Sequence, residues 1–226
     1  MYNINIVTIF PEAFPGILDI SVLSRAREKG IWKLSITDIK KFADNKNSID
    51  DTPFGGGPGM IMKADTLQKA YESALKSFNC DNIDDIEKVI LTPSGITLNQ
   101  KTIEGFSKKK GMILICGRYE GVDERFIEFN NLKRVSIGNY VLSGGEAAAV
   151  VLSETVIRLL PHVLGNSDSK KIESFNNGLL EYPQYTKPRV WQNMAVPEIL
   201  LSGNHKKVSD WRVKKSIEIT KSRLKK

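Results

Sequence analysis

The amino-acid sequence predicts an α/β fold, with a parallel sheet flanked by helices and a small helical domain at the C-terminal end. Short apolar runs typical of buried strands alternate with stretches of helical spacing over residues 1–160. Glycine-rich loops follow several of these runs. A polar, glycine-bounded stretch at 165–178 then precedes a strongly basic C-terminal segment. We therefore expect an α/β domain at 1–160, a flexible linker at 161–178 and a helical domain at 179–226.

The first strands are indicated by β-branched residues at 3–10 (NINIVTIF) and 32–39 (WKLSITDI). A helix-like stretch that ends at Gly30 separates them, so the chain opens with a βαβ unit. Residues 65–78 have helical spacing, and Asp65 is placed to cap that helix. Residues 88–91 (KVIL), 112–116 (MILIC) and 133–137 predict further strands, and their alternation with helices favours a parallel sheet.

The segment 145–160 (GEAAAVVLSETVIRLL) predicts a long helix with apolar residues on nearly every face. Such a helix must be covered on several sides, and we expect a partner subunit to supply part of the cover.

The charge pattern favours a polyanionic partner. Residues 205–226 hold nine lysines and arginines against two acidic residues, which equals the net charge of +7 of the whole chain. A basic element of this kind releases counterions from nucleic-acid phosphates, although a solvated helix end has the same composition. The two cysteines are far apart, so neither a disulfide framework nor a zinc cluster is indicated, and a reducing cytoplasmic setting fits best. No apolar run approaches membrane-spanning length.

Several nucleotide motifs are absent, including GxGxxG and GxxxxGK[ST], and two histidines are too few for a histidine-rich metal site. Instead, glycine-rich loops at 53–60, 117–121 and 136–146 lie beyond predicted strands. Taken singly, each is typical of an ordinary tight turn. Because ligands bind beyond the carboxyl ends of parallel strands, the loops together predict one binding pocket.

Six strings in this order identify a resemblance that covers almost the whole chain. They are DDTPFGGGPGM (50–60), TPSG (92–95), CGRYEGVDER (116–125), SIGNYVLSGGE (136–146), SF with GLLEYPQYTKPRVW (174–191) and VPEILLSGNH (196–205). The sequence resembles the bacterial tRNA (guanine-N1) methyltransferase family. The resemblance implies a SPOUT-type fold with a deep trefoil knot at the cofactor site, which periodicity alone does not predict. It also implies a homodimer with the active site at its interface, and methylation of guanine 37 in tRNA, next to the anticodon.

The resemblance implies S-adenosylmethionine as the methyl donor, and no motif specifies a magnesium site. Backbone groups of the pocket would bind the adenine, and aliphatic side chains would form its walls. Taken alone, Ile137 and Leu142 would instead be assigned to core packing. Glu120 would either face the sulfonium or hold a loop by hydrogen bonding. The cofactor-binding residues carried over are Pro93, Gly117, Tyr119, Glu120, Ile137, Gly138, Asn139, Tyr140, Val141, Leu142, Gly144 and Gly145.

Two residues are implied in catalysis. Arg158 would stabilise the charge that develops on guanine O6 as N1 loses its proton. The family's general base is an aspartate just before SF, whereas this chain has Glu173 there. Glutamate has a similar reference pKa and reaches about 1.5 Å farther, so Glu173 is the expected base. Asp168 in the same loop is the alternative, although an acidic residue in a polar linker is more often only solvated.

The tRNA-binding residues divide into two groups. Asp50 would contact the target guanine or its neighbour, and five basic side chains of the C-terminal helix would contact phosphates: Lys206, Lys207, Arg212, Lys214 and Lys215. Two rival functions remain. The first is methylation of a ribose 2′-hydroxyl on the same fold, which the match of GRYEG and of the SF region disfavours. The second is an RNA-binding protein that has lost catalysis, suggested by the glutamate at position 173.

Overall fold

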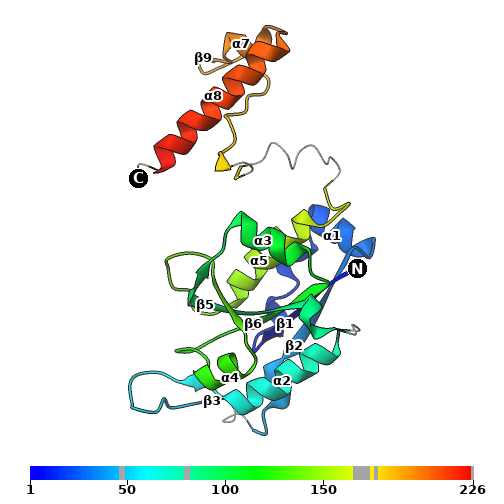
Figure 1. Cartoon of the computed structure of the whole chain (residues 1–226), viewed down its shortest axis with the longest axis vertical. Coiled ribbons are helices and arrows are strands. Elements are labelled where there is room, and N and C mark those ends of the chain that lie inside the picture. The colour runs from blue at the N-terminus through cyan, green and yellow to red at the C-terminus, as the bar shows by residue number, and fades with distance from the viewer. Residues whose placement is uncertain (46–48, 79–81, 165–173, 176–177, 225–226) are drawn as a thin grey trace. The chain divides into compact units, whose positions relative to one another are not determined.

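The computed structural model describes residues 1–45, 49–78, 82–164, 174–175 and 178–224. The chain forms two compact units, Met1–Leu164 and Gly165–Lys226, and we describe each by itself (Figure 1). Most of the predicted linker at 161–178 lies outside the described residues.

The first unit is built on a five-stranded sheet, which confirms the predicted parallel α/β fold. Its strands are β1 (Tyr2–Thr8), β2 (Trp32–Asp38), β5 (Ile86–Thr97), β6 (Gly111–Cys116) and β7 (Lys133–Ser136). Their order across the sheet is β2-β1-β6-β5-β7, and every neighbouring pair is parallel. All six residues of β6 are buried, as expected for a strand with helices on both faces.

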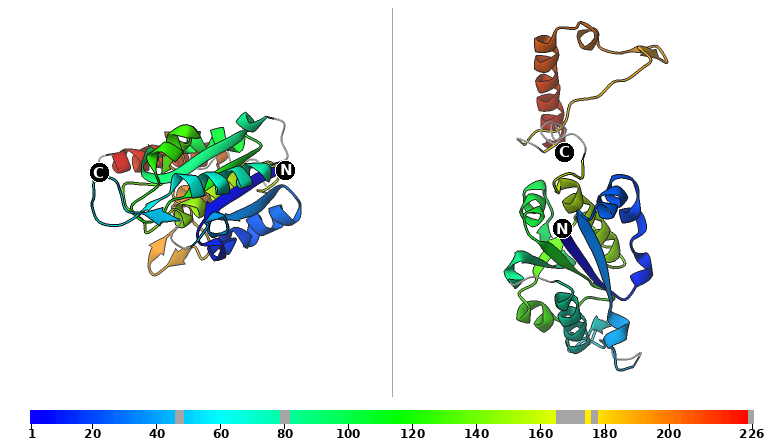
Figure 2. Two further views of the ribbon diagram at one scale, coloured as in Figure 1. Left: turned by 90° about the horizontal axis from the view of Figure 1, so that it is seen from below. Right: turned by 90° about the vertical axis from the view of Figure 1, so that its right-hand side faces the viewer.

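Helices cover the two faces of the sheet (Figures 1 and 2). The helices α1 (Ser21–Glu28), α3 (Gln100–Ser107) and α5 (Glu146–Leu159) share one buried cluster with Leu114 of β6. On the other face, α2 (Ala64–Lys76) and α4 (Glu124–Phe129) share a second cluster with Ile113 and Ile115. Successive β6 side chains therefore alternate between two cores, and the sheet is the middle layer of three.

The helix α5 matches the long apolar helix predicted at 145–160. Most of its residues are buried, but Ala147, Val151 and Glu154 form an exposed stripe at helical spacing. This stripe is the part of α5 that the first unit leaves uncovered.

Two local expectations were wrong. The predicted cap Asp65 lies inside the first turn of α2, where it accepts a hydrogen bond from the Thr66 backbone N–H at 2.9 Å, and Lys63 occupies the cap position. Strand β5 does not end near Leu91 but continues to Thr97, with a register shift between Leu91 and Ile96 against β7. The trefoil knot stays a prediction.

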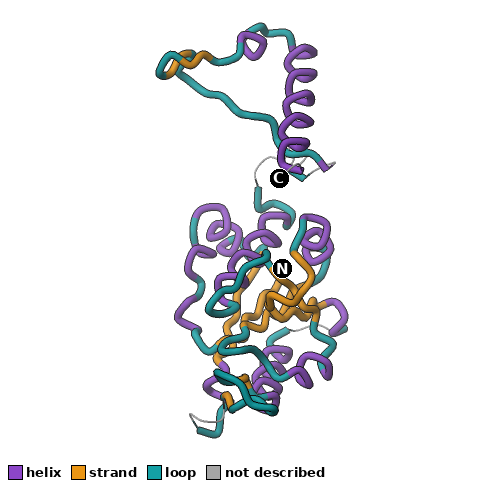
Figure 3. Tube along the Cα trace, turned by 90° about the vertical axis from the view of Figure 1, so that its left-hand side faces the viewer, coloured by secondary structure: helices purple, strands orange, loops and turns teal. Residues whose placement is uncertain are grey.

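Short elements complete the first unit. The described part of this unit has 3₁₀ turns at Pro11–Ala13, Gly16–Asp19, Ile39–Phe42 and Ile83–Asp85, and β3 (Asp50–Asp51) pairs antiparallel with β4 (Ile61–Met62). The second unit contains the hairpin strands β8 (Val190–Trp191) and β9 (Met194–Ala195), then α7 (Glu198–Leu201) and the long α8 (His205–Leu224) (Figure 3). The predicted basic C-terminal helix is therefore present as α8.

Candidate functional site

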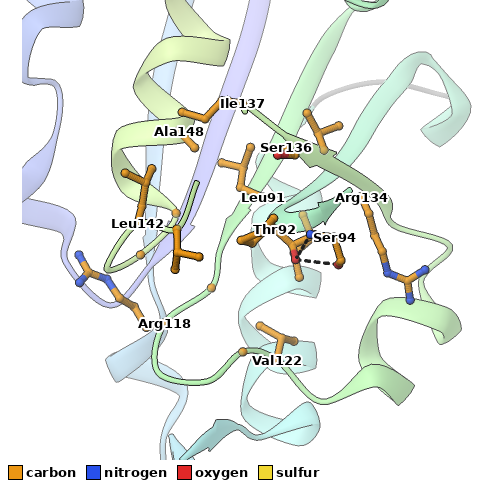
Figure 4. A pocket seen from close by; sticks show the side chains of 18 of the residues that line it. Leu91, Thr92, Ser94, Arg118, Val122, Arg134, Ser136, Ile137, Leu142 and Ala148 are labelled. Carbon is orange, nitrogen blue, oxygen red and sulfur yellow. Dashed lines mark hydrogen bonds between the residues drawn. The ribbon is translucent and has the colours of Figure 1, made fainter. Parts of the chain in front are cut away.

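A cavity of about 340 Å³ lies in the first unit, within the size range of small-molecule sites. Most of its lining comes from residues 90–94 in the middle of β5 and from the loops that follow β6 and β7, and α4 and α5 add a few residues. Figure 4 shows side chains of the three segments converging around it. The cavity therefore lies beyond the carboxyl ends of β6 and β7, as two of the predicted glycine loops indicate, whereas the third loop at 53–60 does not line it.

The cavity brings together eleven of the twelve residues that the resemblance assigns to the cofactor. Asn139 is the exception, because it does not line the cavity although both of its chain neighbours do. That the eleven bind a cofactor stays a prediction. The residues are Pro93, Gly117, Tyr119, Glu120, Ile137, Gly138, Tyr140, Val141, Leu142, Gly144 and Gly145.

Glycine is required where two of these segments touch. A Cβ added at Gly145 would lie 2.7 Å from the Cα of Cys116, inside any normal contact. The Gly145 N–H donates a hydrogen bond of 3.0 Å to the Gly117 carbonyl. The N-terminal end of α5 therefore lies directly against the end of β6, and this approach closes one side of the cavity.

The loop after β7 is held by its own polar groups. The Ser136 hydroxyl donates to the Gly138 carbonyl at 2.9 Å and accepts from the Gly138 N–H at 3.2 Å. The Tyr140 hydroxyl donates to the Ile137 carbonyl at 3.3 Å. Leu142 is 40% exposed, so it is a wall of the open cavity rather than a core residue.

The GRYEG loop carries local backbone strain. Tyr119 has a φ of +57°, which is uncommon for a residue other than glycine and tends to occur at functional sites. Its side chain is half exposed. Partial burial raises the pKa of its hydroxyl most, the nearby Asp50 carboxylate raises it further, and Arg118 lowers it. Asp50 is therefore close enough to Tyr119 to affect its charge, but it does not line the cavity, and its contact with the target base stays a prediction.

The glycine-rich loop at 53–60 is attached to the GRYEG loop at its base. The Glu120 N–H donates to the Met60 carbonyl at 2.9 Å, and the Met62 N–H donates to the Gly121 carbonyl at 2.9 Å. At the other end of this loop, Phe54 is 99% exposed. Two of the predicted glycine loops are thus hydrogen-bonded neighbours.

The sequence reasoning missed several polar residues on the cavity wall. The hydroxyls of Thr92 and Ser94 lie 3.0 Å apart (Figure 4). Arg134 forms an ion pair with Glu124. Thr92 and Ser94 belong to the TPSG string, so that motif was a usable signal. Nothing in the spacing indicated Arg134, because its place depends on the pairing of β7 with β5.

Of the two predicted catalytic residues, only Arg158 lies among the described residues. Arg158 lies in the last turn of α5 and does not line the cavity, whereas Ala148 at the start of that helix does. Ten residues at 1.5 Å each separate the two by about 15 Å along the helix axis. Glu173 and the alternative base Asp168 lie outside the described residues.

The second unit presents the predicted basic side chains on α8. Lys206, Lys207, Arg212 and Lys214 are exposed, while Lys215 is half-buried and pairs with Glu218 at 2.6 Å. The Arg212 guanidinium also lies 4.8 Å from the centre of the Tyr182 ring. A second cavity in this unit is lined by aromatic and basic residues that include Tyr185, Trp211 and Arg189.

Two further features are absent from the described residues. No cluster of three or more histidine, cysteine or acidic side chains could hold a metal ion there. No helix among them is long and apolar enough to cross a membrane.

Comparison with known proteins identifies the family. The family model described as tRNA (Guanine-1)-methyltransferase TrmD matches residues 2–225. The chain is 45% identical to a tRNA (guanine-N(1)-)-methyltransferase of Ehrlichia ruminantium (strain Gardel), over 99% of this chain and 94% of that protein. It is 47% identical to the protein of the same name from Pelagibacter ubique, over 99% and 95%. For Bartonella henselae the identity is 46%, over 98% and 93%. The chain therefore belongs to the tRNA (guanine-N1) methyltransferase family.

Proposed function

We propose that this protein transfers the methyl group of S-adenosylmethionine to N1 of guanine 37 in tRNA, in the cytoplasm. The observation that supports it most strongly is the cavity itself. In a chain that belongs to this family, three segments that carry its motif strings line one space: the TPSG string within β5 and the loops that follow β6 and β7.

The cavity fits an adenosyl and methionyl ligand in shape and chemistry. Gly121 carries no side chain that would keep a ligand from the backbone, while Ile137 and Leu142 offer apolar walls. Glu120 places a carboxylate on the wall, which suits a cationic ligand, whereas the Glu124 carboxylate is paired with Arg134. When bound, S-adenosylmethionine supplies an electrophilic methyl group on a good leaving group.

The protein then has to orient the acceptor and remove one proton. The Glu173 carboxylate takes the N1 proton of guanine, with Asp168 as the alternative base. The freed N1 electron pair forms the bond to the methyl carbon as the bond from carbon to sulfur breaks, leaving a neutral thioether. Arg158 stabilises the negative charge that the loss of the proton spreads to guanine O6.

Two surfaces of the chain suit the tRNA. Asp50, beside the GRYEG loop, is an acceptor for the donors on the Watson–Crick edge of guanine. The exposed cations of α8, such as Lys206, Lys207 and Lys214, suit phosphate contacts that add affinity without reading the sequence.

We propose a homodimer in which the active site lies between subunits. Two observations support this. Arg158 lies about 15 Å along α5 from the cavity of its own chain, so it is better placed to serve a partner's cavity. The exposed stripe of Ala147, Val151 and Glu154 leaves one face of α5 for a partner to cover. Sedimentation tests the claim, and a strictly monomeric mass would refute it.

The proposed reaction is tested by labelled methyl transfer to two tRNA transcripts that differ only at position 37. We expect label on the transcript with guanine and none on the transcript with adenine. Equal labelling of both would reject the specificity. If the protein binds tRNA but not S-adenosylmethionine, it is a binding protein that has lost catalysis.

The assignment of the base needs its own comparison. Glu173→Gln should keep cofactor affinity and lower the methyl-transfer step by roughly 10² to 10⁴. Asp168→Asn is the matched control and should have little effect. Full single-turnover activity in Glu173→Gln would remove the assignment, and a large loss in Asp168→Asn would transfer the role to Asp168.

A further inference from the structure

A buried carboxylate links three segments around the cavity. Glu146, the first residue of α5, is only 6% exposed. Its Oε1 accepts a 2.7 Å hydrogen bond from the Thr8 hydroxyl at the end of β1. Its Oε2 accepts from Nε of Arg118 at 2.9 Å and lies 2.9 Å from Nη2 of the same guanidinium. Both carboxylate oxygens are therefore satisfied by partners from other segments, as a buried charge requires.

The Arg118 guanidinium has further partners besides Glu146. Its Nη1 donates to the Ser143 carbonyl at 3.1 Å. Its Cζ lies 4.4 Å from the centre of the Phe10 ring, a cation–π contact. The Phe10 N–H in turn donates to the Thr8 hydroxyl at 2.9 Å. The contacts thus form a closed circuit from Thr8 through Glu146, Arg118 and Phe10 back to Thr8.

The Arg118 side chain also occupies the space that a side chain at position 144 would need. A Cβ added at Gly144 would lie 2.1 Å from Nε and 2.5 Å from Cδ of Arg118. The side chain of the loop after β6 therefore passes directly over the backbone of the loop after β7. Two loops that both line the cavity are joined at this crossing.

Arg118 lines the cavity, but its guanidinium is engaged by Glu146 and the Ser143 carbonyl. In Figure 4 its guanidinium points away from Thr92, Ser94 and Arg134, the polar side chains on the opposite wall. Glu146 is buried and does not line the cavity, so its carboxylate is available to Arg118 and Thr8 rather than to a ligand. The Arg118–Glu146 pair therefore acts on the shape of the cavity rather than in the chemistry.

We propose that Arg118 and Glu146 are positioning residues that hold the 117–121 and 137–145 loops at the spacing needed to bind the methyl donor. This inference rests on the proposed function, because it takes the cavity to be the cofactor site. Displacing binding groups by about 1 Å can cost a factor of 10² in such a site. A buried ion pair contributes little to stability against an apolar replacement, so a role in fixing geometry accounts for its presence.

The first test uses Glu146→Gln, which keeps the shape and the acceptor for Thr8 but removes the charge. We expect S-adenosylmethionine to bind roughly 10- to 100-fold more weakly by calorimetry. The single-turnover rate at saturating cofactor should change little, because the pair does not contact the reacting atoms. Amide hydrogen exchange in the 137–145 loop of the ligand-free protein should become faster, since the hydrogen bond from Arg118 to the Ser143 carbonyl is weakened.

Arg118→Lys is the second variant and carries the test if Glu146→Gln does not fold. Lysine keeps the charge, but its single nitrogen cannot contact Glu146 and Ser143 together. We expect the same direction of change in cofactor affinity. Asp19→Asn is the matched control, because it removes the acid of the exposed Arg27–Asp19 pair, away from the cavity, and should leave cofactor affinity unchanged.

The double variant Arg118→Met/Glu146→Gln shows whether the two residues act through each other. If the two residues act as one unit, the double variant should lose no more cofactor affinity than Arg118→Met alone. Losses that multiply would mean independent roles and would overturn the proposal. Wild-type affinity in Glu146→Gln and Arg118→Lys, with only a lower melting temperature, would also overturn it. If the wild-type protein itself does not bind S-adenosylmethionine, the proposed function fails instead.

Discussion

Replacing Gly145 by alanine should damage both stability and the cofactor site. The added methyl carbon would lie 2.7 Å from the Cα of Cys116, whereas ordinary contact begins near 3.4 Å. The two segments must therefore separate by about 0.7 Å, because neither contacting group is a flexible side chain. That separation would stretch the 3.0 Å hydrogen bond from the Gly145 N–H to the Gly117 carbonyl beyond bonding distance.

The expected cost follows from these two effects. Overpacking costs about 1–3 kcal/mol, and the lost hydrogen bond costs about 1 kcal/mol. We expect a loss of about 2–4 kcal/mol in the free energy of unfolding, measured by chemical denaturation. The affinity for S-adenosylmethionine should fall as well, because the strained contact forms a wall of the cavity.

Gly105→Ala is the matched control for this prediction. Gly105 lies inside α3, and a Cβ there would meet no atom within 4 Å. The same substitution should therefore stabilise the protein by about 0.4–1 kcal/mol through the lower entropy of the unfolded chain. Gly145→Ala with wild-type stability and cofactor affinity would refute the steric argument.

Three further predictions concern buried side chains. Trp32 is fully buried and donates from Nε1 to the Leu23 carbonyl at 2.9 Å. Trp32→Phe should therefore lower the free energy of unfolding by about 2–4 kcal/mol in chemical denaturation, and an unchanged midpoint would contradict this. Burial raises the pKa of the Cys116 thiol, with a smaller contribution from the Glu146 carboxylate and an opposing effect of Arg118. In a Cys80→Ser chain, a thiol reagent should therefore label Cys116 quickly only after unfolding, and equally fast labelling of the folded chain would contradict this. Burial raises the pKa of Tyr71 to about 12, so the stability that its neutral hydroxyl contributes should be complete below pH 10 and lost as the pH rises towards 12. An absorbance titration in which Tyr71 ionises near pH 10 would refute this prediction.

The strands of the sheet were predictable because their signal is local. The apolar run at 112–116 reads as a buried strand, and β6 is buried at every position. The extension of β5 to Thr97 was not predictable, because Pro93 and Gly95 suggest a loop. Gly95 is instead required where β5 crosses β7, since a Cβ there would lie 2.4 Å from the Val135 nitrogen. Such a contact depends on pairing between segments distant in the sequence.

The hairpin of β8 and β9 was also missed. Gln192 and Asn193 form its turn with φ values of +47° and +64°, but the pair lacks the Asn-Gly signature of such turns. In the candidate site, the glycine motifs predicted which loops meet. They could not predict the circuit from Thr8 to Glu146, whose partners come from three separate segments.

The identity of the methylated nucleoside tests the central claim most directly. The protein would be incubated with an unmodified tRNA transcript and S-adenosylmethionine labelled in its methyl group, and the product digested to nucleosides for mass spectrometry. We predict label in N1-methylguanosine, from position 37 alone, approaching one per tRNA. Label in 2′-O-methylguanosine, label at another position, or no transfer by a chain that binds both substrates would contradict the account.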